Sequence, residues 1–354
     1  MKFYRIKPFD TVVFGENKSS VAGDDHEKGS KFPPEIMKLF NLGKVKFFGI
    51  FPIYGENVLL SAPADLLGKR KSKGGPYHIP KVNGISKNSI VDFETDLGVG
   101  SLPWVDAFEE LEKVNGYVDV KGFRSIMDGR LDYVNVFSES DLFERELRIG
   151  ISLDFSTGTV QESMLYAHFH LRVKEGFLIA LSNGVNAFMM TIGGERKVSR
   201  IQEEEGGLGL KGLMDGKIRL EKGKRYKFYL TTHAFLNGNL KPGSEITIGS
   251  ALDNSSDGIR MRVEWVYSAG AEWISGVEKE VDENGELRKK PAVYMLKPAT
   301  VIVLTPKDDG GEISRLAQIK EPVNFDIGSP EGRKIDKNRF IERGWGSGII
   351  WEIK

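Results

Sequence analysis

The sequence predicts an α+β fold in two halves, and three observations support that prediction. The chain has 354 residues, roughly twice the length of an average domain, so each half is long enough to bury its own core. Short stretches of strand-like alternation are mixed with amphipathic stretches in both halves. The run Glu203-Glu204-Glu205-Gly206-Gly207 interrupts this pattern, because charges followed by glycines favour a connector. We therefore expect one domain over residues 1–204 and a second over residues 205–354.

The first half is predicted to consist of strands, two short helices and two insertions. A helix is expected over 33–43, because Pro33 suits a first helical turn and glycine ends the apolar pattern. A second helix is expected over 104–116, and the polar segment 15–31 and the basic, glycine-rich segment 68–89 are predicted to be irregular. Strands are expected at 3–7, 45–53, 58–61, 147–155, 164–173, 177–181 and 188–192.

The second half is predicted to consist of strands and one helix. Ile313, Leu316 and Ile319 recur at a spacing that puts them on one side of a helix over 312–319. The glycine content of the whole chain is high, at 41 residues, which indicates many turns or places where the backbone approaches a ligand. Strands are expected at 225–232, 259–268, 293–296, 300–305 and 348–353.

Composition narrows the classes of function. Lys and Arg total 50, as do Asp and Glu, and this balance argues against a protein that coats nucleic acid without specificity. There is no cysteine, which excludes disulfides and thiolate metal sites. The start of the chain does not look like a signal peptide, and the apolar run 47–53 is too short to span a membrane. We expect a cytoplasmic protein, and the scarcity of glutamine beside abundant Glu and Lys is typical of a thermophile.

No motif in the sequence makes a case for an active site, a metal or a cofactor. The run 207–212 matches G-x-G-x-x-G, but three glutamates precede it where a dinucleotide site needs a buried apolar strand; a flexible connector explains it better. His168 and His170 point to one face of a predicted strand, but no third metal ligand is apparent. The remaining histidines, His26, His78 and His233, are isolated. We therefore expect a protein that is not an enzyme.

Basic segments beside glycines are better candidates for function. One lies in the irregular segment 68–89, and another follows the pair Gly193-Gly194. Phosphates bind Lys and Arg, and splayed bases stack on aromatic rings or guanidinium planes. Glycine would let backbone N–H groups approach phosphates closely. The cations of the two segments are Lys69, Arg70, Lys71 and Lys73, and Arg196, Lys197 and Arg200.

Six separated segments, taken together with their order and spacing along the chain, resemble the family formed by the third subunit of the Cmr complex, the type III-B CRISPR effector. The opening segment resembles a "Pro-Leu-Asp-Thr-Leu-Phe-Phe" motif, and a later one resembles the family's Gly-Gly-Glu-Arg motif. The others resemble a proline-rich helix entry, a "Pro-x-Pro-x-Asp-Leu" segment, an Arg-Val-Gly-Ile strand and a glycine-rich C-terminal turn. The segments are Lys7–Phe14, Ile192–Lys197, Lys31–Pro34, Ser61–Leu66, Glu146–Ile151 and Gly344–Gly348.

The resemblance implies a RAMP protein of two ferredoxin-like, RRM-like domains with long glycine-rich and irregular insertions. It implies a non-catalytic subunit that holds the 5′ tag of a guide RNA, without cofactor or membrane. Its expected protein partners are the large polymerase-like subunit and the backbone subunits of the complex. The candidate RNA-binding residues are Lys69, Arg70, Lys71, Arg148, Gly193, Gly194, Arg196, Lys197, Arg200, Lys211 and Trp345, the last as a ring on which a base stacks.

Three alternatives stay open from the sequence. A RAMP endoribonuclease that processes precursor RNA would share this fold, and His26 in the first loop would be its suspected catalytic residue. A structural adaptor would contact only protein. A related subunit of another type III or a type I system would carry similar segments.

Overall fold

The structure is a computed structural model in which strands predominate, with a few short helices. The predicted helix 33–43, the segment 15–31, His26 and most of the segment 68–89 lie outside the described residues. Within some strands only the backbone is described. The structure describes residues 1–14, 32, 45–69, 77–78, 90–95, 98–103, 111–153, 160–185, 188–193, 197–235, 240, 242–254, 257–274, 279–281, 287–289, 293–308, 310–320 and 338–353.

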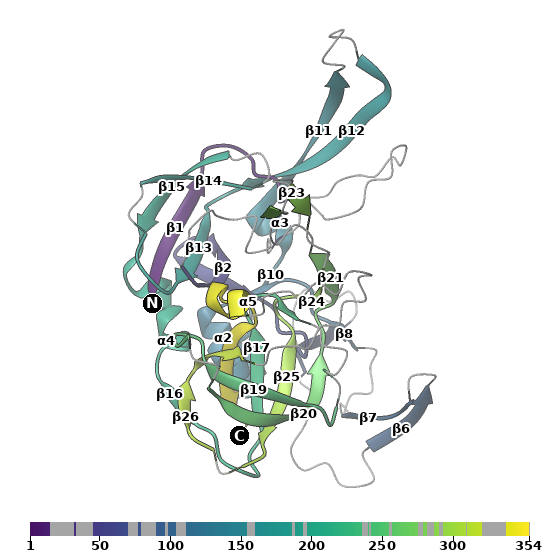
Figure 1. Ribbon diagram of the computed structural model, residues 1–354, viewed down its shortest axis with the longest axis vertical. Helices are drawn as coiled ribbons and strands as arrows, with labels where there is room; N and C mark the ends of the chain where they lie inside the picture. The colour runs from purple at the N-terminus through teal and green to yellow at the C-terminus, as the bar shows by residue number, and fades with distance from the viewer. Residues whose placement is uncertain are drawn as a thin grey trace.

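An eight-stranded sheet dominates the first half (Figure 1). Its order is β10-β9-β3-β2-β13-β1-β15-β14, and every neighbouring pair is antiparallel. Predicted strands form β1, β2, β3, β13 and β14, because their apolar residues alternate or run without a break. The strands are β1 (Lys2–Pro8), β2 (Phe47–Tyr54), β3 (Asn57–Ser61), β9 (Tyr117–Asp119), β10 (Val136–Phe137), β13 (Phe177–Leu181), β14 (Met189–Ile192) and β15 (Lys197–Glu203).

A closed barrel forms the centre of the second half, in the order β17-β25-β20-β19-β27-β28. Closure leaves no exposed sheet edge in this unit. The predicted strands near 225–232, 259–268, 300–305 and 348–353 are all found in it. Its strands are β17 (Tyr226–Leu230), β19 (Glu245–Ser250), β20 (Ile259–Tyr267), β25 (Val301–Pro306), β27 (Leu316–Ile319) and β28 (Ser347–Glu352).

A long hairpin of β11 (Phe143–Leu153) and β12 (Val160–Val173) projects from the body (Figure 1). Other small strands and helices surround the two main units. The other strands are β4 (Leu67–Lys69), β5 (Tyr77–His78), β6 (Ile90–Thr95), β7 (Gly98–Pro103), β8 (Leu111–Lys113), β16 (Lys217–Arg219), β18 (Ala234–Phe235), β21 (Ala271–Ile274), β22 (Lys279–Val281), β23 (Leu287–Lys289), β24 (Val293–Leu296) and β26 (Glu312–Ser314). The helices are α2 (Val120–Met127), α3 (Glu139–Leu142), α4 (Lys211–Met214), α5 (Asn338–Arg343), η2 (Leu131–Tyr133) and η3 (Glu205–Gly209).

The sheet and the barrel share one hydrophobic core. Phe123 of helix α2 lies edge-on to two barrel rings, with centroids 4.8 Å from Tyr229 and 5.8 Å from Trp351. Inside the same interface Lys227 of β17 forms an ion pair with Asp65, and both side chains are almost fully buried. A buried ion pair is costly to break, because either partner alone would be an uncompensated charge. The two halves therefore hold a fixed relative position.

Helix α2 was not predicted, although its local signals are ordinary. Asp119 accepts a hydrogen bond from the backbone N–H of Gly122 at 2.6 Å, which caps the first turn. Phe123 and Ile126 then lie on the buried face of the helix. The helix is only eight residues long, too short for a clear period in the sequence.

Two predicted helices are wrong, at least in part. Residues 312–319 form strands β26 and β27 instead, because β27 pairs with β19 and β28 and completes the barrel. Residues 111–113, assigned to the helix over 104–116, form strand β8 against β4. In both places long-range pairing overrides a short apolar period.

The segment 207–212, which was expected to be a flexible connector, begins instead in an ordered turn. A Cβ at Gly207 would lie 2.6 Å from the ring of Phe3.

Two buried lysines meet where the halves join. Lys46 donates hydrogen bonds to the carbonyl oxygens of Ala251 at 3.0 Å and Asp253 at 2.9 Å, and Lys320 donates to the same Asp253 oxygen at 2.6 Å. Both residues are at least 97 % buried, being 3 % and 1 % exposed. Burial and the neighbouring Lys320 ammonium lower the pKa of Lys46 to about 8.

The lowered pKa of Lys46 predicts a dependence of stability on pH. Between pH 8 and 10.5 the unfolded chain keeps the proton that the folded chain has lost, so the free energy of unfolding should rise with pH. Relative to a Lys46→Met variant, we expect a rise of up to about 1.4 kcal/mol per pH unit in that window. Urea denaturation of both proteins from pH 7 to 10.5 measures it.

Lys217→Met serves as the matched control for that experiment, because the side chain of Lys217 is 70 % exposed. The free energy of unfolding of Lys217→Met should differ from that of the parent protein by a constant amount until pH 10 is approached. If the free energies of the parent protein and Lys46→Met also differ by a constant amount, burial does not destabilise the ammonium of Lys46.

Candidate functional site

Three segments meet at one end of strand β1. The chain that follows β1 is tied to β15 through a hydrogen bond from Phe9 N to Val198 O at 3.2 Å. On its other side it is tied to β12 by a pair of bonds between Val12 and Leu171, each 2.9 Å long. The base of the β11–β12 hairpin and the start of β15 are thereby held on either side of residues 9–13.

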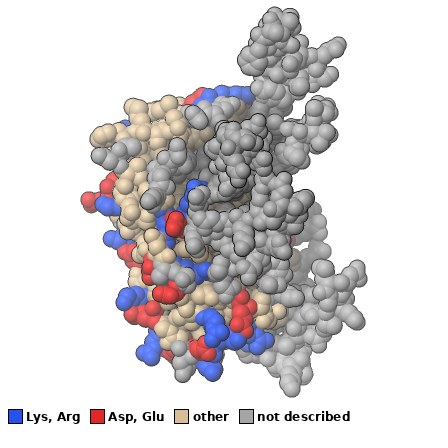
Figure 2. All heavy atoms as spheres, viewed as in Figure 1, with Lys and Arg blue, Asp and Glu red and all other residues tan. Residues whose placement is uncertain are grey.

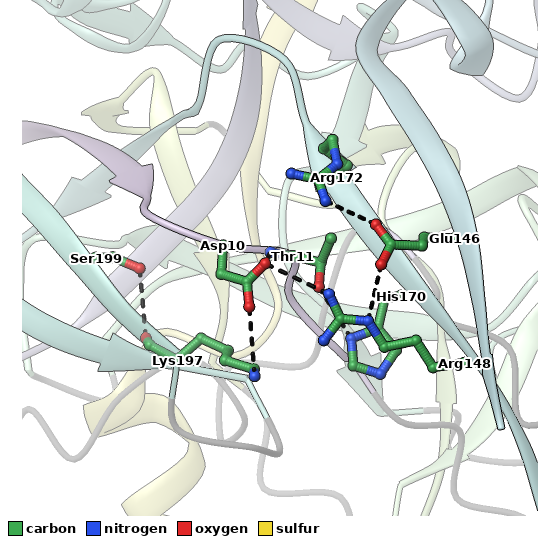
Figure 3. Close-up of polar contacts among 8 residues, drawn as sticks. All are labelled: Asp10, Thr11, Glu146, Arg148, His170, Arg172, Lys197 and Ser199. Atoms are coloured by element: carbon green, nitrogen blue, oxygen red, sulfur yellow. Dashed lines mark hydrogen bonds and ion pairs between the residues drawn. The ribbon is translucent and has the colours of Figure 1, made fainter. Parts of the chain in front are cut away.

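Asp10 lies at the centre of this junction (Figure 3). One carboxylate oxygen accepts a hydrogen bond from the backbone N–H of Thr11 at 2.7 Å and lies 3.5 Å from Nη2 of Arg148 on β11. The other oxygen lies 3.6 Å from Nζ of Lys197 on β15. Two cations that are far apart in the sequence are therefore brought together by a single carboxylate.

Glu146 supplies the second carboxylate of the group. It lies two residues before Arg148 on β11, hence on the same face of the strand, and accepts from Nε of Arg148 at 2.9 Å. Its other oxygen accepts from Nη2 of Arg172 on β12 at 2.7 Å. We call Asp10, Glu146, Arg148, Arg172 and Lys197 the Asp10 cluster.

The cluster contains three cations and two carboxylates, and the contacts shift the pKa values of Asp10, Glu146 and Arg148. The Thr11 N–H, with the Arg148 and Lys197 charges, lowers the pKa of Asp10. Hydrogen bonds from Arg172 and then Arg148 lower the pKa of Glu146. The bond to Glu146 in turn raises the pKa of Arg148. Both carboxyls are therefore ionised at neutral pH, and the formal charges of the five side chains sum to plus one.

His170 lies beneath the cluster and supports it. The residue is 2 % exposed, and its Nδ1 lies 3.0 Å from Oγ1 of Thr11. A histidine so enclosed has no direct route to a substrate, so we assign it a structural role. His233, the other histidine whose side chain is described in detail, is equally buried and bonds to Glu272 at 2.7 Å.

Gly193 also approaches this junction. Its φ of 75° lies in the left-handed region, and a Cβ there would lie 2.7 Å from the carbonyl oxygen of Val13. The chain then runs through residues 194–196, outside the described part, to Lys197. The structure thus gathers three of the predicted residues, Arg148, Gly193 and Lys197, around residues 10–13.

Other predicted residues do not join this group. Arg200 lies three positions after Lys197 on β15 and therefore points to the opposite face of the sheet. Lys211 follows η3, which packs on the other end of β1, and lies 3.9 Å from Asp215. The side chain of Lys69 and residues Arg70, Lys71, Gly194 and Arg196 lie outside what the structure describes.

Trp345 requires a correction. It is 2 % exposed and packs in the core, with its ring centroid 6.0 Å from that of His233. A base cannot stack on a ring that is enclosed in this way, so the expected stacking role does not fit the structure. The glycines on either side of it, at φ values of 92° and 71°, form a turn that buries the ring.

Nothing in the sequence identified Asp10, Glu146 or Arg172 as members of one site. Asp10 and Thr11 stand within the opening segment that carries the family resemblance, but nothing local identifies them as partners of β11 or β15. Glu146 and Arg172 are ordinary charged residues in a chain with 50 acidic and 50 basic side chains. Only the register of β11 on β12 and the path of residues 9–13 bring them together.

Within the described residues, no group of three or more His, Asp or Glu side chains could hold a metal ion. No helix in that part of the chain is long and apolar enough to cross a membrane.

Comparison with known proteins gives a family match and distant structural neighbours. The model of a family described as "CRISPR-associated protein (Cas_Cmr3)" matches residues 4–292. A chain of "Cryo-EM structure of the Type III-B Cmr-beta bound to cognate target RNA and AMPPnP, state 1" is 16% identical, with a TM-score of 0.43 over 85% of this chain and 86% of that one. A chain of "Cryo-EM structure of the Type III-B Cmr-beta bound to cognate target RNA" is 15% identical, with the same TM-score and coverage. No curated protein matches the sequence.

The geometry of the Asp10 cluster predicts how its carboxyls titrate. Both midpoints should lie below the ordinary values of 3.8 for Asp and 4.5 for Glu, so the cluster contributes stability above those values and loses it as pH falls through the lowered ones. Arg172→Gln should raise the midpoint of Glu146 and leave that of Asp10 unchanged, because Arg172 bonds Glu146 and, within the described residues, no other carboxylate. Carboxyl-carbon NMR measures both midpoints. Ordinary midpoints for both carboxyls in the parent protein would show that the ion pairs of the cluster do not form in solution.

Proposed function

Because the chain belongs to the Cas_Cmr3 family of CRISPR-associated proteins, we propose that it is a non-catalytic subunit of a type III-B Cmr effector that binds the 5′ tag of the guide RNA. The resemblance found in the short motifs is confirmed by the family match. In the proposed complex, the subunit connects the large polymerase-like subunit to the backbone subunits in the cytoplasm. The Asp10 cluster is the observation on which the RNA-binding part of the proposal rests.

The Asp10 cluster suits a phosphate because its cations are already in position. Arg148 is held by Asp10 and Glu146, and Lys197 is held by Asp10. Fixing long side chains before binding lowers the entropy that binding must remove. A phosphate oxygen that replaces the Asp10 carboxylate would receive both cations at once, with the fork of Arg148 able to donate two parallel bonds. Gly193, beside residue 13, leaves the backbone free of a side chain there.

The carboxylates make the site selective. A chain with zero net charge attracts polyanions weakly, and Asp10 and Glu146 repel a phosphate that is not correctly placed. Binding is therefore favourable only for an RNA end whose backbone follows the positions of the cations. This behaviour fits a tag of fixed sequence and shape better than an RNA of any sequence.

The strand order supports the finer proposal of two ferredoxin-like domains. Four central strands of the sheet, numbered along the chain as β1, β2, β13 and β15, occur in the order 4-1-3-2. Four barrel strands, β17, β20, β25 and β28, occur in the same order. This is the order of an antiparallel ferredoxin-like sheet. In the second set helix α5 lies between the third and fourth strands, as that fold requires.

Removing the two cations tests the proposed contact. We expect Arg148→Ala and Lys197→Ala each to weaken the binding of a single-stranded RNA carrying the tag sequence by about tenfold, because each removes a charged hydrogen bond. Each should also reduce the slope of log affinity against log salt by about 0.7. Fluorescence anisotropy with the full chain across a range of salt concentrations measures both quantities.

Arg145→Ala is the matched control for Arg148→Ala. Arg145 lies on the same strand but on the other face, paired with Glu139, so its loss should leave affinity unchanged. Asp10→Asn should strengthen binding, because it removes a competitor for both cations. Equal affinity in the Arg148, Lys197 and Arg145 variants would remove the cluster from the RNA site, and cleavage of repeat RNA by the purified chain would overturn the non-catalytic role.

A further inference from the structure

One edge of the eight-stranded sheet is formed by strand β14. Among the described residues, β14 pairs with β15 alone, and its sequence, Met-Met-Thr-Ile, has no charge and no proline. Natural proteins commonly shield such edges with lysine, proline or a covering loop, since open backbone groups attract other strands. In the described part of the chain, neither charge nor proline prevents another strand from pairing with this edge.

The hydrogen-bond register shows which backbone groups face outward. Ile201 N donates to Phe188 O at 3.0 Å, and Met190 is paired with Ser199. In an antiparallel ladder hydrogen-bonded and non-hydrogen-bonded pairs alternate. Met189 and Thr191 therefore direct their N–H and C=O groups away from β15, toward the open side.

Exposed apolar side chains accompany this edge. Met189 is 64% exposed, Phe9 63% and Val198 48%. Phe9 bonds to Val198 through the backbone, and Val198 lies opposite Thr191, so the side chains extend across neighbouring strands. The corresponding upper left of Figure 2, where Figure 1 places β14 and β15, is mostly free of charged side chains. A contiguous apolar patch of this kind marks an interaction site.

Two cations complete this surface. Lys7 on β1 lies opposite Arg200 on β15, and Arg200 lies opposite Met189 on β14, so the three share one face of the sheet. Lys7 and Arg200 are exposed, and neither has an ion-pair partner within the described part of the chain. We call Lys7, Phe9, Met189, Val198 and Arg200, with the open side of β14, the edge surface.

The edge surface is separate from the proposed RNA site. Lys197 of the Asp10 cluster and Arg200 of the edge surface lie on opposite faces of β15. A side-chain substitution on one face of β15 should therefore leave the side chains on the other face in position.

We propose that the edge surface docks a protein partner, which adds an extended strand to β14 and carries apolar side chains interspersed with Asp or Glu. The open N–H and C=O groups would pair with its backbone. The apolar side chains would cover Met189 and Val198, and a carboxylate would meet Lys7 and Arg200. Charge complementarity selects an acidic segment.

Two other occupants fit less well. RNA would gain phosphate contacts from Lys7 and Arg200, but Met189 and Val198 offer it no ring on which to stack, and the open strand edge would remain unpaired. A second copy of the chain would bring the same two cations to the same surface, where they would repel each other.

Photo-crosslinking tests the proposal in the assembled complex. A benzophenone analogue of phenylalanine replaces Met189, which is 64% exposed and lies opposite Arg200, and the complex is purified with its natural subunits and RNA before irradiation. We expect a crosslink to another polypeptide, at a segment that carries both apolar and acidic residues. A crosslink to RNA, to a second copy of this chain or to a segment without acidic residues, or no crosslink at all, would overturn the proposal. The same analogue in place of Tyr133, which is 72% exposed and lies beside β10 at the other edge, should not reach that segment.

A proline variant separates strand addition from simple apolar contact. Thr191→Pro removes one outward N–H and leaves the β14–β15 ladder intact, since proline is tolerated on an outward-facing edge position. We expect it to lower the crosslink yield from position 189 about fivefold, the effect of one lost hydrogen bond. Thr191→Ala should not change the yield, and both variants should bind tag RNA as the parent does. Equal yields in the two variants would exclude strand addition.

Discussion

The packing of the eight-stranded sheet on the six-stranded barrel is the constraint on which the rest of the structure depends. One hydrophobic core contains residues of both halves, and helix α2 places Phe123 between them against Tyr229 and Trp351. The buried pair of Asp65 and Lys227 lies in the same interface. Removing either partner would leave an uncompensated buried charge, at a cost of about 3–5 kcal/mol. The halves are therefore expected to unfold together, and the sheet is a fixed platform.

The barrel covers one face of the sheet, and a second hydrophobic cluster covers much of the other face. This second cluster anchors the base of the β11–β12 hairpin through Phe143 and Leu171. That anchoring brings β11 beside residues 9–13, and β15 approaches from the other side. The Asp10 cluster forms where these rigid pieces meet. Its charged side chains are positioned by backbone pairing, which gives them more order than isolated surface ion pairs have.

The distribution of charge explains how a neutral chain can serve an RNA-guided complex. The Asp10 cluster has one net positive charge, and the opposite face of β15 carries Lys7 and Arg200 beside apolar side chains. Two surfaces of different chemistry thus lie back to back on one strand. In the proposed complex one would hold the guide and the other a neighbouring polypeptide, so that the position of the RNA end is fixed relative to another subunit.

The sequence by itself determined most strands and indicated the family, because apolar periodicity and short motifs are local. It also pointed to Arg148, Gly193 and Lys197. It could not show that 312–319 are strands, since a barrel is completed only by distant partners. Nor could it separate Arg200 from Lys197, enclose Trp345 or choose Asp10 among 50 acidic residues. Those outcomes depend on which strands pair and in which register, and register arises only when the two halves bury their shared core.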